Sequence, residues 1–217
     1  MVPRIHCITD LSLAVATSTA REPLSDARVR GLLDLLEAAV RAGVDAVQIR
    51  AKHATDRALL DLTSSVIARV RPLGAAVIVN DRLDVALAAD ADGVHLGLAD
   101  LPVRVVRRLV PAAFLVGGTC RNDEHARQAR DEGADYAGVG PVYPTSTKQG
   151  FPAPVGLAAV RSAAAFLPVV AVAGITLQRI PEVMAAGAHG VAVVAAISRA
   201  PDPARAAREI VEAVRAA

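Results

Sequence analysis

Residues 42–49 of the chain read Ala-Gly-Val-Asp-Ala-Val-Gln-Ile, in which small residues suited to a helix end stand directly before a strand-like apolar run. A glycine at such a junction is typical of a helix that ends in the left-handed conformation. Similar segments return three times, at residues 89–96, 132–139 and 186–193. The stretch therefore predicts a helix followed by a buried strand, used four times along the chain.

Four further apolar runs each follow a proline and alternate strictly with the first four; they lie at residues 4–8, 75–79, 113–116 and 169–172. Helical patterns separate the runs, at residues 29–41, 56–71, 103–109, 123–132, 177–185 and 203–216. Strands that are apolar throughout indicate burial on both faces, as in a parallel sheet covered by helices. Eight such strands predict a (β/α)8 TIM barrel. A doubly wound open sheet is the alternative, but it would rarely need eight parallel strands in so short a chain.

Length and composition agree with this fold class. The chain has 217 residues, which fits a single TIM-barrel catalytic domain over residues 1–217. Hydrophobic residues make up 53% of it and aromatic residues only 2%, so we expect a core of small aliphatic side chains.

Charge, cysteine content and hydropathy exclude several classes of partner. The net charge is +2, and the basic residues are spread along the helical patterns, which argues against nucleic acid. No apolar stretch reaches the length that spans a membrane. The two cysteines do not form a disulfide or metal pattern, so a reducing compartment is the default. We expect a soluble cytoplasmic protein that acts on small molecules; a homo-oligomer is possible.

The polar residues that follow the predicted strands point to the mouth of the barrel, where TIM barrels carry their chemistry. After the second strand comes Gln48-Ile49-Arg50-Ala51-Lys52, in which strand alternation puts Gln48, Arg50 and Lys52 on one side. Two cations aimed into a barrel are costly unless an anion binds them. We predict a polyanion site, diphosphate more readily than monophosphate. The alternative is an arginine paired with an aspartate elsewhere.

Two carboxylates follow neighbouring strands. Asn80-Asp81 ends the third strand, and Asp100 lies shortly after the fourth. Beside a diphosphate site, such a pair suits Mg²⁺, which takes one or two protein carboxylates and completes its shell with water and phosphate oxygens. A general acid and base pair is a competing function. Helix N-caps are an equally simple interpretation for each aspartate alone, with Asp81 before a helix at 82–88.

A ligand loop, for phosphate, is predicted at Gly138-Val139-Gly140-Pro141-Val142-Tyr143-Pro144-Thr145-Ser146-Thr147-Lys148-Gln149-Gly150. Glycines and hydroxyls expose N–H and O–H donors, and Lys148 is one of only two lysines in an arginine-rich chain. A plain turn is the alternative. After strands seven and eight, Gly174 and Val194-Ala195 stand where such barrels often bind phosphate through backbone N–H groups, and they predict a second phosphate site distinct from the diphosphate site. Gly174 alone could equally be a turn glycine.

Other polar residues receive no role from the sequence. His95 stands at the end of the fourth strand without a nucleophile or carboxylate beside it, so we interpret it as a strand-end residue with a satisfied hydrogen bond. Cys120 has no neighbour that would activate it as a thiolate. The long segment 11–26, with Pro23 and Ser/Thr clusters, is hypothesised to be a lid over the mouth.

Together these motifs resemble the thiamine-phosphate synthase family, from the first strand to the last. The resemblance implies a barrel that joins hydroxymethylpyrimidine diphosphate to thiazole phosphate and releases diphosphate with Mg²⁺. It implies catalytic roles for Arg50, Lys52 and Lys148, and metal ligation by Asp81 and Asp100. The pyrimidine diphosphate would be bound by Gln48, Arg50, Lys52, Asn80, Thr119 and Lys148. The thiazole phosphate would be bound by Thr145, Thr147, Gly174, Val194 and Ala195.

Two positions depart from the family pattern. Thr119 replaces a serine after the fifth strand and keeps the hydroxyl, and Ala195 replaces a serine and loses one. Two alternatives to the synthase stay open. One is the related thiazole tautomerase, whose histidine would fall on Arg121, and the other is a catalytically silent barrel that binds a phosphorylated metabolite.

Overall fold

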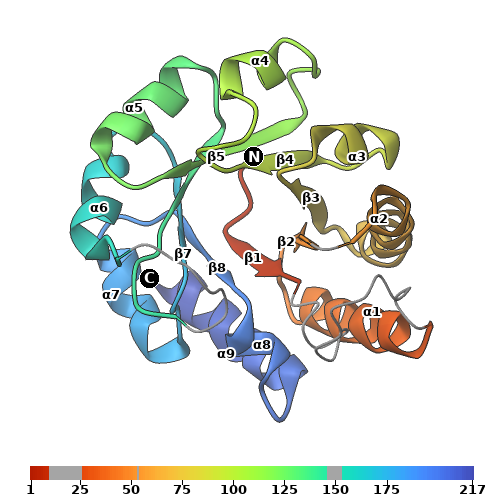
Figure 1. The fold of residues 1–217 in the computed structure, drawn as a ribbon. Helices are drawn as coiled ribbons and strands as arrows, with labels where there is room; N and C mark the ends of the chain where they lie inside the picture. The colour runs from red at the N-terminus through yellow and green to blue at the C-terminus, as the bar shows by residue number, and fades with distance from the viewer. Residues whose placement is uncertain (10–25, 53, 146–152) are drawn as a thin grey trace.

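The computed structural model describes residues 1–9, 26–52, 54–145 and 153–217. Within these residues, eight parallel strands form a closed barrel in which each strand pairs with the next and the eighth pairs with the first. Figure 1 shows the strands in the middle and the helices around them. The predicted TIM barrel is confirmed, and the open doubly wound sheet is wrong because β1 and β8 are paired along Ile5–Cys7.

The mouth of the barrel is the end at which the eight strands finish, and the bounds of the elements define it. The strands are β1 Ile5–Ile8, β2 Ala46–Ile49, β3 Ala76–Asn80, β4 Gly93–Leu96, β5 Leu115–Cys120, β6 Tyr136–Val139, β7 Val169–Val172 and β8 Gly190–Val193. The α-helices are α1 Asp26–Arg41, α2 Asp56–Val70, α3 Leu83–Ala88, α4 Val103–Arg107, α5 Asp123–Asp131, α6 Gly156–Ala163, α7 Ile180–Ala185, α8 Ala195–Ser198 and α9 Pro203–Ala216. Short 3₁₀ turns, η1 Arg71–Leu73 and η2 Leu177–Arg179, precede β3 and α7.

The fifth strand differs from its prediction. It was expected at residues 113–116 but runs over Leu115–Cys120, so Thr119 lies inside the strand rather than after it. Gly117 and Gly118 interrupt the apolar run in the sequence, yet both continue the ladder with β6. The helix α6 was not predicted, and the pattern at 177–185 divides into η2 and α7.

The repeated helix-to-strand junctions behave as the opening stretch predicts. Gly43, Gly133 and Gly187 have φ of 108°, 92° and 94°, in the left-handed region that favours glycine. Two residues after Gly43, the carboxylate of Asp45 accepts hydrogen bonds from the backbone N–H groups of Ile5 (2.6 Å), which begins the preceding strand β1, and of Arg4 (3.1 Å), just before it. The repeat therefore ties its own strand to the one before it.

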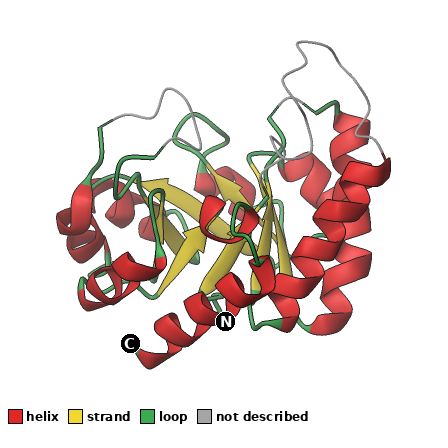
Figure 2. Cartoon of the chain, turned by 90° about the horizontal axis from the view of Figure 1, so that it is seen from below, coloured by secondary structure: helices red, strands yellow, loops and turns green. Residues whose placement is uncertain are grey.

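Two other copies of the repeat use the same contact. Asp92 accepts from the N–H of Val77 at 2.8 Å, and Asp135 accepts from the N–H of Val116 at 2.7 Å. All of these bonds lie at the strand ends remote from the mouth. Both chain termini lie at this same end (Figure 2), where the Arg4 guanidinium donates to the Val214 carbonyl at 2.9 Å. No helix of the described residues is long and apolar enough to cross a membrane.

The interior of the barrel is filled by a few rings and small aliphatic residues. Tyr136 is 1% exposed and stands between His6 and His95, with ring centroids 5.4 and 5.6 Å away. Gly117 and Gly138 make room for these rings, because a Cβ at Gly117 would overlap the Tyr136 ring and one at Gly138 would overlap the His95 ring. A larger aliphatic core lies between the strands and the helices.

The variant Gly117→Ala is expected to lose about 3 kcal/mol of unfolding free energy, because overpacking of a full core forces side chains and backbone to move. The adjacent Gly118→Ala is the matched control. Its added Cβ would meet Ala129 Cβ and Val103 Cγ2 at 3.5 Å, an ordinary van der Waals contact. Urea unfolding of both variants measures the difference. Equal stabilities would contradict this account of the barrel interior.

Candidate active site

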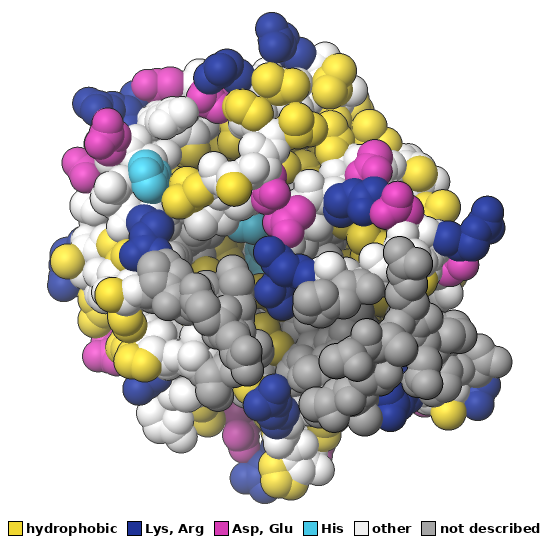
Figure 3. Space-filling model, viewed as in Figure 1, with side chains coloured by type: hydrophobic (Ala, Val, Ile, Leu, Met, Phe, Trp, Pro, Cys, Tyr) yellow, Lys and Arg dark blue, Asp and Glu magenta, His cyan; other side chains and the backbone are white. Residues whose placement is uncertain are grey.

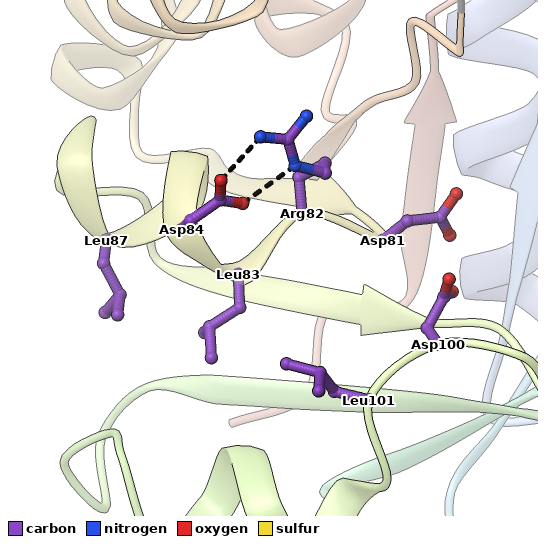
Figure 4. Close-up of a pocket in the computed structure, with 7 residues that line it drawn as sticks. All are labelled: Asp81, Arg82, Leu83, Asp84, Leu87, Asp100 and Leu101. Atoms are coloured by element: carbon purple, nitrogen blue, oxygen red, sulfur yellow. Dashed lines mark hydrogen bonds and ion pairs between the residues drawn. The ribbon is translucent and has the colours of Figure 1, made fainter. Parts of the chain in front are cut away.

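Acidic and basic side chains meet at the mouth of the barrel, where the strands end (Figure 3). Asp81 directly follows β3, and Asp100 lies in the loop between β4 and α4. A cavity of about 470 Å³ has both aspartates in its lining and extends outward over α3, between Leu83, Leu87 and Leu101 (Figure 4). The predicted carboxylate pair is therefore brought together.

The two carboxylates face each other, as Figure 4 shows. Burial raises the pKa of Asp81 above its ordinary value, and the neighbouring Asp100 raises that pKa further through a hydrogen bond and its charge. Lys52 opposes this effect, with its Nζ 3.5 Å from Asp81 Oδ2. Asp100 is held by the Gly97 N–H, which donates to its Oδ2 at 2.6 Å. The site thus concentrates negative charge that one lysine only partly balances.

The helix N-cap interpretations of these aspartates are wrong. The helix α3 begins after Arg82, and no side chain caps it. Pro102 precedes α4, again without a side-chain cap. Asp81 has φ of 67°, a left-handed conformation that Asp and Asn tolerate better than most residues, and this backbone turns its side chain to Asp100 instead.

The donor chemistry of this pair fits Mg²⁺. Oxygen ligands from two carboxylates suit the ion, and the remaining positions of its shell would be left for water and substrate oxygens. The described residues contain no group of three or more His, Cys, Asp or Glu that could hold a metal, so a dedicated all-protein cage is absent there. The raised pKa of Asp81 would also serve an acid and base pair, and this alternative stays open.

The second strand supplies an amide and two cations. Gln48, in β2, is a buried polar residue with 5% of its surface exposed. Arg50 is half-buried, and Thr9 Oγ1 fixes its backbone by accepting from its N–H at 2.9 Å. Among the described residues Arg50 has no ion-pair partner, whereas Lys52 pairs with Asp81. Within the part of the chain that the structure describes, an aspartate thus pairs with the lysine and none pairs with the arginine.

The loops after β6 and β7 pack tightly together. Gly174 has φ of 69°, and a Cβ there would lie 2.7 Å from Tyr143 Cβ and 2.8 Å from the Pro144 carbonyl oxygen. Thr145 follows directly. Arg179 was missed by sequence reasoning; it donates to the Gly174 carbonyl at 2.6 Å, and its guanidinium stands 4.2 Å from the Tyr143 ring centre. This arginine therefore joins the two loops. It lies in a short 3₁₀ turn rather than directly after a strand, so its position in the sequence did not indicate a place near the site.

Of the remaining predicted residues, three lie at strand ends, one lines a second cavity, and the others lie outside the described residues. Asn80 ends β3 beside His95, and Val194 and Ala195 lie at the start of α8 after β8. Thr119 lies in β5 and lines a second cavity of about 290 Å³ together with Asp100. Thr147, Lys148 and the proposed lid segment 11–25 lie outside the described residues, so their roles stay predictions; residue 26 begins α1.

His95 has the satisfied hydrogen bonds that its sequence context predicts. Its Nδ1 lies 3.2 Å from the Tyr136 hydroxyl and its Nε2 lies 3.0 Å from Thr119 Oγ1. Desolvation lowers the pKa of His95 to about 4, so its imidazole is neutral near pH 7. Burial also raises the pKa of Tyr136 and that of the Cys120 thiol, the latter to about 12, so this cysteine is not activated.

Comparison with known proteins gives a consistent result. A family profile described as thiamine monophosphate synthase matches residues 21–197. A thiamine-phosphate synthase from Salinispora arenicola is 43% identical over 214 residues, which covers 97% of each chain. A thiamine biosynthesis bifunctional protein from Symbiobacterium thermophilum is 46% identical over 209 residues, 95% of this chain and 42% of that protein. The solved thiamine phosphate pyrophosphorylase from Pyrococcus furiosus superposes with a TM-score of 0.82 at 31% identity, over 98% of this chain and 96% of that one.

Proposed function

The chain belongs to the thiamine monophosphate synthase family, and from this premise we propose how its residues share the synthesis of thiamine phosphate. The protein is an enzyme of the transferase class. It transfers the hydroxymethylpyrimidine group from its diphosphate to thiazole phosphate and forms thiamine phosphate and diphosphate. Neither the tautomerase nor the silent barrel is favoured by any observation on this chain.

The observation that carries the assignment of roles is the Asp81 and Asp100 carboxylate pair with Lys52 beside it. We assign the diphosphate of the pyrimidine substrate to this place. Arg50 and Lys52 would bind its oxygens, and Lys148 would add a third positive charge. Gln48, Asn80 and Thr119 would orient the substrate from the barrel interior.

Asp81 and Asp100 are proposed to hold Mg²⁺, since their carboxylates otherwise repel each other across a partly buried space. The ion would supply positive charge to the oxygens of the leaving diphosphate. Lys52 lies within ion-pair distance of Asp81 and would then be released to the substrate. We also expect one catalytic domain over residues 1–217, acting on small molecules in the cytoplasm, with a homo-oligomer possible.

The thiazole phosphate is assigned to the other side of the mouth, at Gly174, Val194 and Ala195, with hydroxyls from Thr145 and Thr147. Backbone N–H groups are the main donors, because Ala195 carries no side-chain hydroxyl. The phosphate would fix the thiazole ring so that its nitrogen faces the methylene carbon of the pyrimidine. Positioning of this kind supplies a large part of a rate acceleration.

In the reaction, the bond between the methylene carbon and the diphosphate oxygen breaks, and the oxygen leaves with the electron pair. The methylene cation is stabilised by the pyrimidine, and the thiazole nitrogen donates its lone pair to form the new carbon–nitrogen bond. Arg50, Lys52 and Lys148 stabilise the negative charge that develops on the leaving group. The proposal needs no protein nucleophile.

The variant Arg50→Gln tests the diphosphate site. We expect kcat/KM for the pyrimidine diphosphate to fall about a hundredfold, because a charge-assisted contact to a partly buried anion contributes roughly 3 kcal/mol. Thiamine phosphate formation with Mg²⁺ is the measurement, and Arg205→Gln, which removes a surface cation paired with Glu209, is the control. Unchanged kinetics in Arg50→Gln would remove Arg50 from the site. A well-folded wild type that forms no thiamine phosphate would refute the function itself.

A further inference from the structure

Successive backbone carbonyls tie the loop after β7 to the loop after β6. The carbonyls of residues 172–173 accept from the backbone N–H groups of residues 142–143, at 3.0 and 3.2 Å. The next residue of the β6 loop is Pro144, which lies beside Gly174 and has no N–H to donate to the Gly174 carbonyl. The Arg179 side chain supplies the missing donor, with its Nη1 2.6 Å from the Gly174 oxygen.

A carbonyl that is held in this way also fixes the N–H of its own peptide unit. The peptide bond between Gly174 and Ile175 is trans, so its C=O and N–H point in opposite directions. Because the carbonyl points to the guanidinium of Arg179, the Ile175 N–H points away from that guanidinium. No backbone carbonyl of the described residues accepts from this N–H. It is therefore available to donate to a ligand.

The direction of this N–H agrees with the place assigned to the thiazole phosphate. Arg179 stands on the side of the β6 loop, with its guanidinium 4.2 Å from the Tyr143 ring centre. In the barrel, β7 lies between β6 and β8. The side away from Arg179 is then that of the loop after β8, which carries Val194 and Ala195.

Both ends of this peptide unit are held by the surrounding structure. The Arg179 guanidinium packs on the Tyr143 ring, and the Tyr143 hydroxyl donates to Glu182 Oε1 of α7. The Ile175 side chain is 5% exposed and belongs to the aliphatic core. Ala173, just before the unit, has φ of 74°, a conformation that a residue with a Cβ keeps only where its surroundings fix it. Removing the guanidinium would free the peptide unit to rotate.

We propose that Arg179 is a positioning residue, which acts through the Gly174 carbonyl to direct the Ile175 N–H toward the phosphate of the thiazole substrate. The inference rests on the proposed function, because it takes thiazole phosphate as the ligand of this loop. The guanidinium lies on the opposite side of the peptide unit and does not bind the phosphate itself. Loss of Arg179 should weaken binding of thiazole phosphate and not of the pyrimidine diphosphate.

The test follows the Ile175 amide by NMR in the full chain made with isotope-labelled isoleucine, with thiazole phosphate as the probe. Ile175→Val identifies the signal. In the wild type, the amide proton should move downfield on binding, because its N–H then donates to a charged acceptor. In Arg179→Met this movement should be lost, and the dissociation constant should rise at least about tenfold, because a hydrogen bond to a charged group is removed. Neither readout requires turnover.

Arg4→Met is the matched control for Arg179→Met. The Arg4 guanidinium also donates to carbonyls, those of His189 at 3.0 Å and Val214 at 2.9 Å, but at the end remote from the mouth. This variant should lose stability and bind thiazole phosphate as the wild type does. The dissociation constant of the pyrimidine diphosphate with Mg²⁺ should stay within about twofold in all folded variants, since its site is remote from these changes.

Arg179→Lys tests the proposal by partial rescue. Its ammonium keeps a positive charge and a donor for the Gly174 carbonyl but lacks the planar fork that packs on Tyr143. Its affinity for thiazole phosphate and its Ile175 movement should lie between those of the wild type and Arg179→Met. If Arg179→Met does not fold, wild-type values in Arg179→Lys overturn the inference.

Unchanged affinity in Arg179→Met, an equal loss of affinity in Arg4→Met, or an Ile175 amide that does not move in the wild type would overturn the inference. An amide that moves as in the wild type while Arg179→Met loses affinity would also overturn it, because the guanidinium would then bind the phosphate directly. These results leave the proposed function intact when the wild type forms thiamine phosphate. A wild type that shows the Ile175 movement but forms no thiamine phosphate would refute the proposed function and keep the positioning role.

Discussion

Replacing Asp81 by asparagine is expected to lower kcat about a thousandfold while it stabilises the metal-free protein. Loss of a charged ligand removes several kcal/mol of transition-state stabilisation from a metal site, and about 4 kcal/mol corresponds to a thousandfold. Asparagine tolerates the left-handed backbone at φ of 67°, so the substitution adds little strain. Turnover at saturating Mg²⁺ and both substrates is the measurement.

The stability part follows from the raised pKa of Asp81. A carboxyl whose pKa is higher in the folded than in the unfolded state destabilises the fold when it ionises. The metal-free wild type should therefore lose stability as pH rises from the ordinary carboxyl range through the raised pKa, and Asp81→Asn should lack this loss. Melting temperatures in EDTA should differ more at pH 7 than at pH 4, with the variant higher.

Asp56→Asn is the matched control for Asp81→Asn. Asp56 lies on the surface, where a hydrogen bond and ion pair with Arg82 lower its pKa, so its removal should not stabilise the protein. Turnover should be unchanged. If Asp81→Asn keeps wild-type kcat, the magnesium assignment fails; if it melts no higher than wild type in EDTA at pH 7, the repulsion between Asp81 and Asp100 is refuted.

Gly174→Ala should raise KM for thiazole phosphate about a hundredfold, because displacements on the order of 1 Å in a binding site cost this much. The new Cβ would press on Tyr143 and Pro144 and separate the two loops that carry the phosphate donors. KM for the pyrimidine diphosphate should stay within about twofold, since the loops after β2, β3 and β4 do not move. Steady-state kinetics with each substrate varied in turn measures both values.

Gly74→Ala separates the backbone cost from the steric one. Gly74 also has a left-handed φ, 89°, but no atom lies within 4 Å of its added Cβ, and it precedes β3 at the end away from the mouth. Both variants should lose some stability, on the order of 1 kcal/mol from the left-handed backbone. Only Gly174→Ala should change KM, and equal kinetics in the two would contradict the assignment of the thiazole phosphate to Gly174.

The sequence predicts the barrel well because its signals are local and repeated. Glycines mark the ends of helices and apolar runs mark buried strands, so both indicate secondary structure from nearby residues alone. The strand Val169–Val172 and the helix Pro203–Ala216 are found with their predicted bounds. The fifth strand was misplaced because Gly117 and Gly118 look like a turn in isolation. The reason for glycine at 117 lies in a neighbouring strand, where the Tyr136 ring needs the space.

For the candidate site, too, local sequence indicates individual residues but not the contacts between distant ones. The carboxylate pair and the Gln48, Arg50 and Lys52 run were found because residue type and position after a strand carry the signal. Local sequence left the helix N-cap interpretation of Asp81 equal to the metal interpretation. The structure excludes the N-cap, because no side chain caps α3, and it places Asp81 against Asp100, while the metal role stays a proposal. The links from His95 to Tyr136 and Thr119 join residues 41 and 24 positions apart, which no local pattern reports.

The aspartate bonds made by Asp45, Asp92 and Asp135 have an evolutionary consequence. They secure the strands at the end of the barrel remote from the mouth. The residues assigned to substrates lie at the opposite end, so these contacts are separate from the site. Selection on substrate preference can therefore act on the mouth loops while the anchoring contacts persist. A descendant of this chain could acquire a different phosphorylated substrate by exchanging those loops, with its ancestral scaffold retained.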